Sequence, residues 1–471
     1  MILLKKTLYL SLAVVTAAFL TIAFAAEKPG GDKKGKQSLE KGAGIPRHQI
    51  LNINNITTWA RSDGESNHSP GGDNGVYYPV GTGNVVYEDG IVFGSKLFLN
   101  AARTQAPSVQ PIRVGGGTYL SNVGTKAGYV TGLGATAVAA DVNAADVRYY
   151  RVRRDYASMT EGELRFDAQT SYELARLDQV TTTQIEAIRA QYELDWKEWP
   201  VAKGAPYIDR NNNGKYDPPP AFGPDFTVDS LISGNYDEPG VAGADLTTPA
   251  DQVMWTVYND LDRALSLRFE GSNPTGLEIQ VTTFGYKRTD ALGNVYFKRL
   301  RITNKGGVDI GAGQIGAFYI DSMYVCQWSD IDLGDAFDDL AGCDTTLSMA
   351  FIYNALPVDG TFVRYGLPPP CSGYDFLAGP LIPGAPTDSA VVDFKRVFGK
   401  KNLPMTGFSY FSAGSPYSDP PFNNYETGAG RWWKMLRGFA PLGTITEADK
   451  PYNYPPAVGP SKFPLSGDPV T

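Results

Sequence analysis

Apolar and polar residues alternate along several short stretches in the second half of the chain. Residues 253–258 read Val-Met-Trp-Thr-Val-Tyr, and residues 277–283 read Leu-Glu-Ile-Gln-Val-Thr-Thr. A period of two places successive side chains on opposite faces of a β-strand. We therefore predict a strand at each place. The polar residues of the second stretch predict that only one face of its strand is buried.

The residues that follow extend this pattern with one irregularity. Within 295–302 the apolar residues switch from one parity to the other, which predicts a β-bulge or a strand that passes between two sheets. Asn-Lys-Gly-Gly at 304–307 predicts a turn, and a further strand is expected over 314–320.

The first half of the chain carries signals for a hairpin and a helix. Apolar runs at 85–87 and 91–93 flank Glu-Asp-Gly at 88–90, a sequence that favours a tight hairpin turn. Further along, Thr183 and Glu186 fit a capping box. Apolar residues then recur at steps of three and four, which predicts one amphipathic helix that ends at Pro200: Ile185, Ile188, Tyr192, Trp196 and Trp199.

These patterns predict a mainly β protein built from antiparallel β-sandwich domains, Ig-like or jelly-roll-like, with one amphipathic helix and long loops. The expected segments run in this order: a signal peptide (1–25), a flexible linker (26–45), an N-terminal β domain that ends in the helix (46–200), a calcium-loop and acidic connector (201–247), a β-sandwich domain (248–403) and an aromatic, Pro-rich loop region (404–471).

The N-terminus has the features of a secretory signal. Lys5 and Lys6 precede an apolar stretch at 8–26, in which Ala23 and Ala25 supply the small residues that precede a cleavage site. The stretch is close to the ~20 residues that a membrane span needs, so a retained anchor is the alternative. We predict cleavage, no membrane span afterwards, and a location outside the cell or on the outer surface of a bacterium.

Charge narrows the classes of partner. The chain has 42 Lys and Arg against 50 Asp and Glu, a formal net charge of -8, and loss of Lys5 and Lys6 with the signal peptide would make it -10. Nucleic-acid binders present basic surfaces, so we expect no nucleic acid as partner. An acidic chain is suited to binding cations.

Few residues could form a thiol or histidine site. Cys326, Cys343 and Cys371 are compatible with one disulfide, either Cys326–Cys343 or Cys343–Cys371, with one thiol left over. The only histidines are His48 and His68, and their polar surroundings predict solvated loop positions. This scarcity argues against His-based triads and multi-His zinc sites.

The sharpest motif lies at 209–217. Asp209, Asn211, Asn213 and Asp217 place side-chain oxygens at positions 1, 3, 5 and 9 of a loop with Gly at position 6. Ca²⁺ takes six to eight oxygen ligands, and this spacing can wrap them around one ion, with the Lys215 carbonyl at position 7. Position 12 is Pro220 rather than Glu, so other ligands are needed, such as Asp225 or water. An Asn/Gly turn without metal is the alternative.

A second acidic segment follows at 330–344. Six carboxylates lie within fifteen residues and repel one another unless a cation or water screens them, which predicts a second calcium site: Asp330, Asp332, Asp335, Asp338, Asp339 and Asp344. A solvated acidic loop is the alternative. A pair of carboxylates for glycoside hydrolysis is the least favoured interpretation, because the two groups must flank a sugar.

Aromatic residues near the C-terminus are the third candidate. Trp432 and Trp433 could stack on sugar rings, and packing of long loops onto the sheets explains them equally well. Walker A, nucleophile-elbow and HExxH motifs are absent from the sequence. We therefore identify no catalytic residue and expect that the protein is not an enzyme.

Several segments resemble a group of secreted or cell-surface β-sandwich proteins of Bacteroidetes-like bacteria, whose function is unassigned. The resemblance rests on residues 204–218, 250–260, 297–306, 329–347 and 463–471. Such proteins are usually longer, and many end in a C-terminal β domain that directs type IX secretion, so the chain resembles an N-terminal fragment of one or the product of a gene cut short. The resemblance implies an extracellular location and a β architecture.

Together these observations predict a secreted or cell-surface, calcium-stabilised β-sandwich protein. Its expected role is structural, adhesive or interaction-forming, with an extracellular protein or polysaccharide, or a second copy of itself, as partner. The alternative is a secreted module that binds or hydrolyses polysaccharide. Aromatic rings that line a groove beside the acidic residues would favour this alternative, and buried rings would favour the structural role.

Overall fold

The structure is a computed structural model that describes residues 48–70, 75–120, 122–220, 227–241, 247–412, 414–453 and 460–467. The predicted signal peptide and linker lie outside the described residues. Within the described ranges, no helix is long and apolar enough to cross a membrane.

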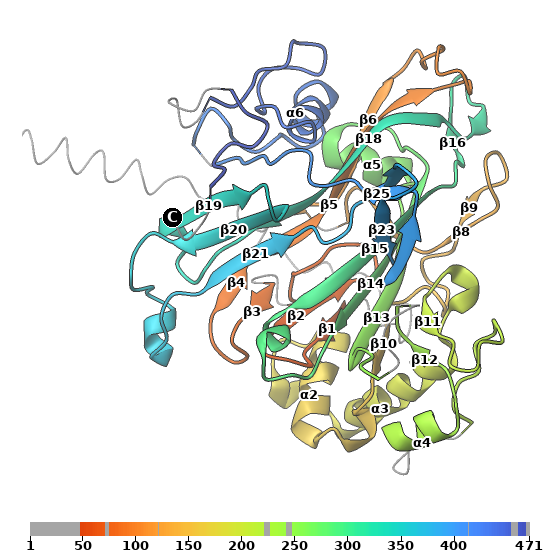
Figure 1. Cartoon of the computed structure of the whole chain (residues 1–471), viewed down its shortest axis with the longest axis vertical. Helices are drawn as coiled ribbons and strands as arrows, with labels where there is room; N and C mark the ends of the chain where they lie inside the picture. Colours follow the sequence, from red (N-terminus) through yellow and green to blue (C-terminus); the bar gives the residue numbers. More distant parts are fainter. Residues whose placement is uncertain are drawn as a thin grey trace, which may run out of the picture.

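The predicted mainly β, antiparallel architecture is confirmed (Figure 1). The central sheet has the order β10 (Tyr150–Arg153), β13 (Gln252–Asn259), β14 (Leu277–Gly285) and β15 (Tyr296–Asn304), and β7 (Lys126–Ala127) also pairs with β13. Its strands come from both sides of the predicted connector, because β10 pairs with β13. The segments 46–200 and 248–403 therefore share one sheet.

Three further sheets have three or four strands each. One contains β18 (Tyr319–Asp330), β5 (Glu88–Phe98) and β6 (Ile112–Gly116); the second contains β1 (His48–Leu51), β2 (Thr57–Arg61), β3 (Val76–Tyr77) and β4 (Asn84–Val86); the third contains β19 (Asp339–Asp344), β20 (Met349–Asn354) and β21 (Cys371–Asp375).

The remaining strands form short two-stranded pairs. They are β8 (Val130–Thr131) with β9 (Val138–Ala139), β11 (Tyr207–Ile208) with β12 (Glu238–Pro239), β16 (Val308–Asp309) with β17 (Ile315–Gly316), β22 (Leu381–Pro383) with β25 (Lys400–Asn402), and β23 (Ser389–Val392) with β24 (Lys395–Phe398). The sheets of the described residues do not close into a sandwich or a barrel.

Strand β14 is buried on both faces, so the prediction of one exposed face is wrong. Its polar face is covered by two segments that satisfy its side chains. Glu278 accepts a hydrogen bond from the Val130 amide (2.7 Å), and Gln280 donates to the Lys203 carbonyl (2.9 Å). Buried polar groups are tolerated when they are paired in this way.

Strand β15 pairs with β14 residue by residue without the predicted bulge. The apolar residues of β15 change parity because both faces of the strand pack against apolar neighbours. Phe297 stacks on Phe284 with a centroid distance of 5.0 Å, whereas Leu300 and Ile302 pack against a cluster on the other side. No turn is assigned at 304–307, where Gly306 instead forms an isolated bridge with Gly134; Gly306 and Gly307 have φ values of 74° and 75°. Residues 314–320 divide between β17 and the start of β18.

The predicted hairpin at 88–90 is wrong, because Glu88, Asp89 and Gly90 lie within the long strand β5. Asp89 is buried there because it is paired. Its carboxylate contacts the Lys298 ammonium at 2.7 Å and accepts a hydrogen bond from the Tyr374 hydroxyl at 2.9 Å. Such pairing offsets the cost of removing a carboxylate from water.

Two long helices, rather than one, lie at the end of the molecule where β1 and β10 are found (Figure 1). Helix α3 (Thr182–Lys197) is the predicted helix, but its capping box uses Thr181 and Gln184 instead of Thr183 and Glu186. Helix α2 (Glu161–Ser171) was not predicted, because few apolar residues mark its buried face. The other α-helices are α4 (Val228–Ser233), α5 (Arg263–Glu270) and α6 (Gly430–Met435).

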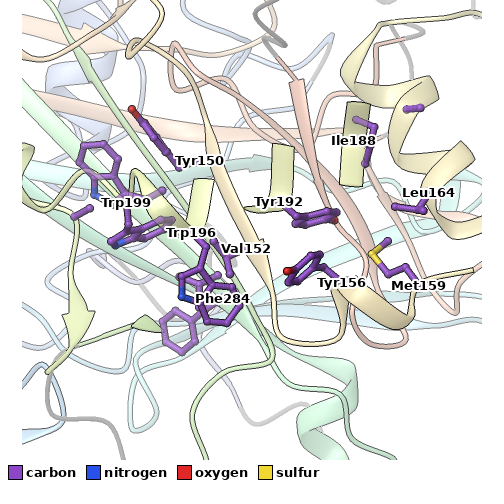
Figure 2. Close-up of a cluster of buried hydrophobic side chains, with 14 of the residues drawn as sticks. Tyr150, Val152, Tyr156, Met159, Leu164, Ile188, Tyr192, Trp196, Trp199 and Phe284 are labelled. Atoms are coloured by element: carbon purple, nitrogen blue, oxygen red, sulfur yellow. The ribbon is translucent and has the colours of Figure 1, made fainter. Parts of the chain in front are cut away.

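The apolar stripe of α3 packs into the largest core, as predicted. Figure 2 shows Trp196 near Val152 of β10 and Tyr192 beside Tyr156, and Phe284 of β14 belongs to the same cluster. A second cluster joins α6 to β5, β6 and β18. A third, which includes Phe93 and Ile279, packs the β18–β5–β6 sheet against the central sheet.

Candidate metal centre in the 209–217 loop

The loop at 209–217 is fixed at both ends by the protein core. It begins directly after β11, which pairs with β12. Near its other end, the Tyr216 hydroxyl donates a hydrogen bond to the Trp196 carbonyl of α3 (2.7 Å), and the Tyr216 ring packs edge-on against Tyr207 (5.4 Å). The exposed residues between these anchors therefore span a fixed gap.

Four of the predicted ligand residues face one another in this loop. The two oxygens of Asp209 accept hydrogen bonds from the amides of Asn213 (3.2 Å) and Gly214 (2.8 Å). Asp217 Oδ2 accepts from the side-chain amides of Asn211 (3.2 Å) and Asn213 (2.6 Å). Gly214, with a φ of 73°, supplies the sharp turn that this arrangement requires.

The arrangement suits a hard cation. The amide hydrogens of Asn211 and Asn213 point at the Asp217 carboxylate and lower its pKa, so the group stays ionised. The oxygens of both side chains accept backbone amides in this orientation, so binding an ion requires each amide to rotate about its terminal torsion and to give up that hydrogen bond. With the oxygens turned inward, the loop offers carboxylate and amide ligands to one ion. Lys215 donates its backbone amide to Asn213 Oδ1 (2.8 Å), and Asp225 lies outside the described residues.

Asp237 holds the two ends of the loop together and was missed by sequence reasoning. Its side chain is 0% exposed. One oxygen accepts from the Arg210 amide and the other from the Asp217 amide, both at 2.8 Å. Burial raises the pKa of Asp237. No local motif marks this residue, because β12 meets the loop only through the fold.

The neighbouring Glu238 connects this anchor to the central sheet. Its two oxygens contact two guanidinium groups, Arg210 in the loop and Arg154 just after β10 (3.0 Å). Arg154 in turn donates its backbone amide to the Asp251 carbonyl beside β13 (2.9 Å). The candidate loop is therefore linked to the main sheet by buried charges.

The six carboxylates of the second acidic segment do not gather around one centre. Asp344 lies at the far end of β19, where it accepts hydrogen bonds from Thr346 (2.7 Å) in the turn to β20. Asp335 caps a short 3-10 helix at 336–338. Asp330 ends β18 opposite Glu88. These positions serve local turns and strand ends.

Four carboxylates at the start of β19 do lie near one another. Burial, with contributions from Asp332, Asp338 and Asp359, raises the pKa of Asp339 to about 6. Asp359, which sequence reasoning missed, accepts hydrogen bonds from the backbone amides of Asp335 and Phe362 (2.8 and 2.7 Å). These two backbone hydrogen bonds satisfy the Asp359 carboxylate within the protein itself.

The predicted disulfide is not formed, and all three cysteines are free. Cys343 lies opposite Ala350, and Cys371 lies opposite Tyr353 on the other side of β20. An offset of three residues and two strand spacings separates their Cα atoms by roughly 14 Å, far beyond the ~7 Å limit for a disulfide. Burial raises the pKa of the Cys326 thiol to about 12.

Trp432 and Trp433 are each 3% exposed and belong to the cluster that packs α6 onto β5 and β18. Trp432 Nε1 donates a hydrogen bond to the buried Glu270 (2.8 Å), and Trp433 packs edge-on against Tyr324 (5.7 Å). Neither ring can stack on a sugar in this arrangement.

Both histidines are more buried than the sequence predicted. His48 lies in β1 and contacts Glu173 through Nδ1 (2.9 Å). Within the part of the chain that the structure describes, one group of three carboxylate, imidazole or thiol side chains has its ligand atoms within 4.8 Å of one another. His68 belongs to this group. That group is Glu65, His68 and Glu88. No local spacing motif joins Glu88 to the other two.

Comparison of the chain with protein-family profiles, with curated proteins and with solved structures found no significant match.

Proposed function

We propose that this chain is an exported, calcium-stabilised β protein of a bacterial surface, with a structural or interaction-forming role. The observation that carries this proposal is the 209–217 loop, in which Asp209, Asn211, Asn213 and Asp217 converge between two fixed ends. The signal-like N-terminus and the resemblance to secreted Bacteroidetes-like proteins support the location outside the cell, where calcium is abundant.

Calcium binding would stabilise the folded protein by mass action. For a modest site with a Kd of ~10⁻⁴–10⁻³ M, which is typical of extracellular modules, ~1 mM Ca²⁺ contributes about 0.4–1.4 kcal/mol. This contribution is small against the stability of a chain of this size. The ion therefore orders the loop and the junction between α3 and the β11–β12 pair rather than permitting the fold.

An open groove supports the interaction-forming role. It has a volume of about 4080 Å³ and is lined by β15, β18 and β21. Several large apolar side chains of the neighbouring segments are exposed, including Phe337, Leu377 and Phe398. Exposed apolar side chains beside a groove are a feature of protein interaction sites. We propose that the β18–β5–β6 sheet and the central sheet form an open sandwich with this groove at its edge.

The carbohydrate-binding alternative depended on the rings of Trp432 and Trp433. Trp432 borders the open groove near Asp330 and Asp332, but it is only 3% exposed, and both rings are packed in a core. Buried rings favour the structural role over this alternative.

Asp217→Asn tests the calcium proposal most directly. It removes a ligand charge but keeps the backbone amide and carbonyl of residue 217, which bond Asp237. Asp209→Ala is less informative, because it also removes two backbone-amide contacts that hold the turn without any ion. Calorimetry should detect one calcium site at 209–217 in the wild type and its loss in Asp217→Asn.

The matched control is Asp229→Asn, which makes the same charge change at an exposed position of α4. It should bind calcium like the wild type. The two variants should also have equal melting temperatures in chelator. Unchanged calcium binding by Asp217→Asn would refute a site in this loop.

A further inference from the structure

Glu65, His68 and Glu88 converge although they come from two separate parts of the chain. Glu65 and His68 belong to the turn that follows β2, and Glu88 is the first residue of β5. Backbone hydrogen bonds hold the turn in place, from the Asn67 amide to the Trp59 carbonyl (2.7 Å) and from the Asp89 amide to the Ser66 carbonyl (3.2 Å). The three side chains are therefore presented by ordered backbone.

Glu88 is the unusual member of this group. It is 1% exposed, and neither of its carboxylate oxygens accepts a hydrogen bond from a described residue. Its nearest polar partner is His68 Nδ1, at 3.4 Å from Oε2, and that nitrogen also lacks a hydrogen bond among the described residues. Leaving a buried carboxylate without a donor costs several kcal/mol, so this site needs a further partner.

The local charge balance indicates that the partner is a cation. Among the described residues, four carboxylates, Asp63, Glu65, Glu88 and Asp89, adjoin two side-chain cations. Arg61 contacts Asp63 and Glu65, and Lys298 contacts Asp89. Neither cation forms a salt bridge with Glu88 among the contacts of the described residues. Two negative charges are therefore left over at the histidine, which a divalent ion would neutralise.

We propose that Glu65, His68 and Glu88 bind a divalent transition-metal ion of the zinc type. His68 Nδ1 lies 3.8 Å from Glu65 Oε1 and 3.4 Å from Glu88 Oε2. Tetrahedral zinc with bonds of about 2.0–2.2 Å places neighbouring ligand atoms about 3.3–3.6 Å apart. Both distances to the imidazole come within a few tenths of an ångström of this range, and all three ligand atoms lie within 4.8 Å of one another. Imidazole with carboxylate selects zinc-like ions over calcium, which prefers oxygen alone.

The surroundings already orient the ligands. Arg61 Nη1 holds Glu65 Oε2 at 2.9 Å, which leaves Oε1 on the side of His68. Such second-sphere contacts fix a ligand and tune its affinity for metal. Three protein ligands leave a fourth position for water. The side chain of His68 is 15% exposed and gives the ion a route from solvent. This site is distinct from the 209–217 loop and goes beyond the proposed calcium function.

Zinc titration by calorimetry tests the proposal, in buffer with excess Ca²⁺ so that the calcium loop is saturated. The wild type should bind one Zn²⁺, and His68→Gln and Glu88→Gln should each weaken binding by at least about 100-fold, more than the loss of an outer-sphere contact does. His48→Gln is the matched control, because it removes the other histidine, which contacts Glu173 instead. It should bind Zn²⁺ like the wild type, and so should Asp217→Asn.

A second measurement on the unmodified protein covers the case in which a variant fails to fold. The chain has only two histidines, so the imidazole signals in a spectrum of histidine-labelled protein can be assigned with His48→Gln. Zn²⁺ should shift the His68 signal and leave that of His48 in place. Absence of stoichiometric zinc binding, equal shifts of both signals, or full affinity in Glu88→Gln would each overturn the proposal.

Discussion

Replacing Asp339 with asparagine should stabilise the protein at neutral pH and leave it unchanged in acid. Asp339 opens β19 and accepts one hydrogen bond, from the Leu333 amide to Oδ2 (2.9 Å). Its other oxygen is buried without a hydrogen bond from a described residue. Burial, with the charges of Asp332 and Asp338, raises its pKa to about 6. An asparagine keeps the acceptor and replaces the unsatisfied oxygen with a donor.

The magnitude follows from the raised pKa. A folded-state pKa of about 6 against an ordinary value of 3.8 corresponds to about 3 kcal/mol lost on ionisation, and screening of this half-buried group by water reduces the loss to about 1–2 kcal/mol. The folded state holds the proton more tightly, so the favourable contribution is complete below pH 3.8. It is lost as pH rises through about 6.

Urea unfolding of Asp339→Asn and the wild type between pH 3.5 and 8 measures this difference. The free energies of unfolding should agree near pH 3.5, diverge from there to about pH 6 and stay apart by about 1–2 kcal/mol above it. Asp344→Asn is a matched control in the same acidic segment. Its folded pKa is lowered by hydrogen bonds from Thr346, so this substitution should have the opposite sign, with an effect that disappears as the pH falls.

The same experiment in calcium decides the role of the second acidic segment. An ion held among these carboxylates would make Asp339→Asn destabilising when calcium is present. Such a reversal, or a difference that does not depend on pH, would refute the reasoning above.

Two further predictions concern the loop anchor and the cysteines. Asp237→Ala leaves the buried amides of Arg210 and Asp217 without an acceptor, so it should lower the free energy of unfolding by about 2–4 kcal/mol and weaken calcium binding. The control Asp229→Ala, on exposed α4, should change the free energy of unfolding by less than ~0.5 kcal/mol. Equal effects of the two substitutions in urea unfolding would contradict the anchoring role. Thiol titration should find three reactive thiols in denaturant and only the exposed Cys371 in the native protein. Fewer than three reactive thiols in denaturant would show that a disulfide forms.

Periodicity in the sequence located the central strands and one of the two long helices. The strands β13 and β14 and the buried stripe of α3 follow directly from steps of two and of three to four residues. Periodicity could not reveal which segments cover the face of a strand. The polar positions of β14 indicate an exposed face, yet Glu278 and Gln280 are buried because the segments near Val130 and Lys203 supply their partners.

Local turn chemistry failed where tertiary charge pairing overrides it. Glu-Asp-Gly at 88–90 is a strong turn signal, but Lys298, more than two hundred residues away, holds Asp89 inside a strand. The same limit applies to the candidate sites. The candidate residues of the 209–217 loop are contiguous and could be recognised from the sequence, whereas Asp237 and the Glu65–His68–Glu88 group are assembled only by the fold.

The buried charges also explain how binding at an exposed loop can affect the central sheet. Asp217 is bonded through its backbone to Asp237, and the adjacent Glu238 connects Arg210 of the loop with Arg154 beside β10. Each of these buried groups depends on its partner, because an unpaired charge in the interior costs several kcal/mol. An ion that fixes the 209–217 loop therefore also fixes Arg210 and, through Glu238, the end of β10. Calcium at the surface should slow amide hydrogen exchange in β10 as well as in the loop, and Asp217→Asn should abolish both effects.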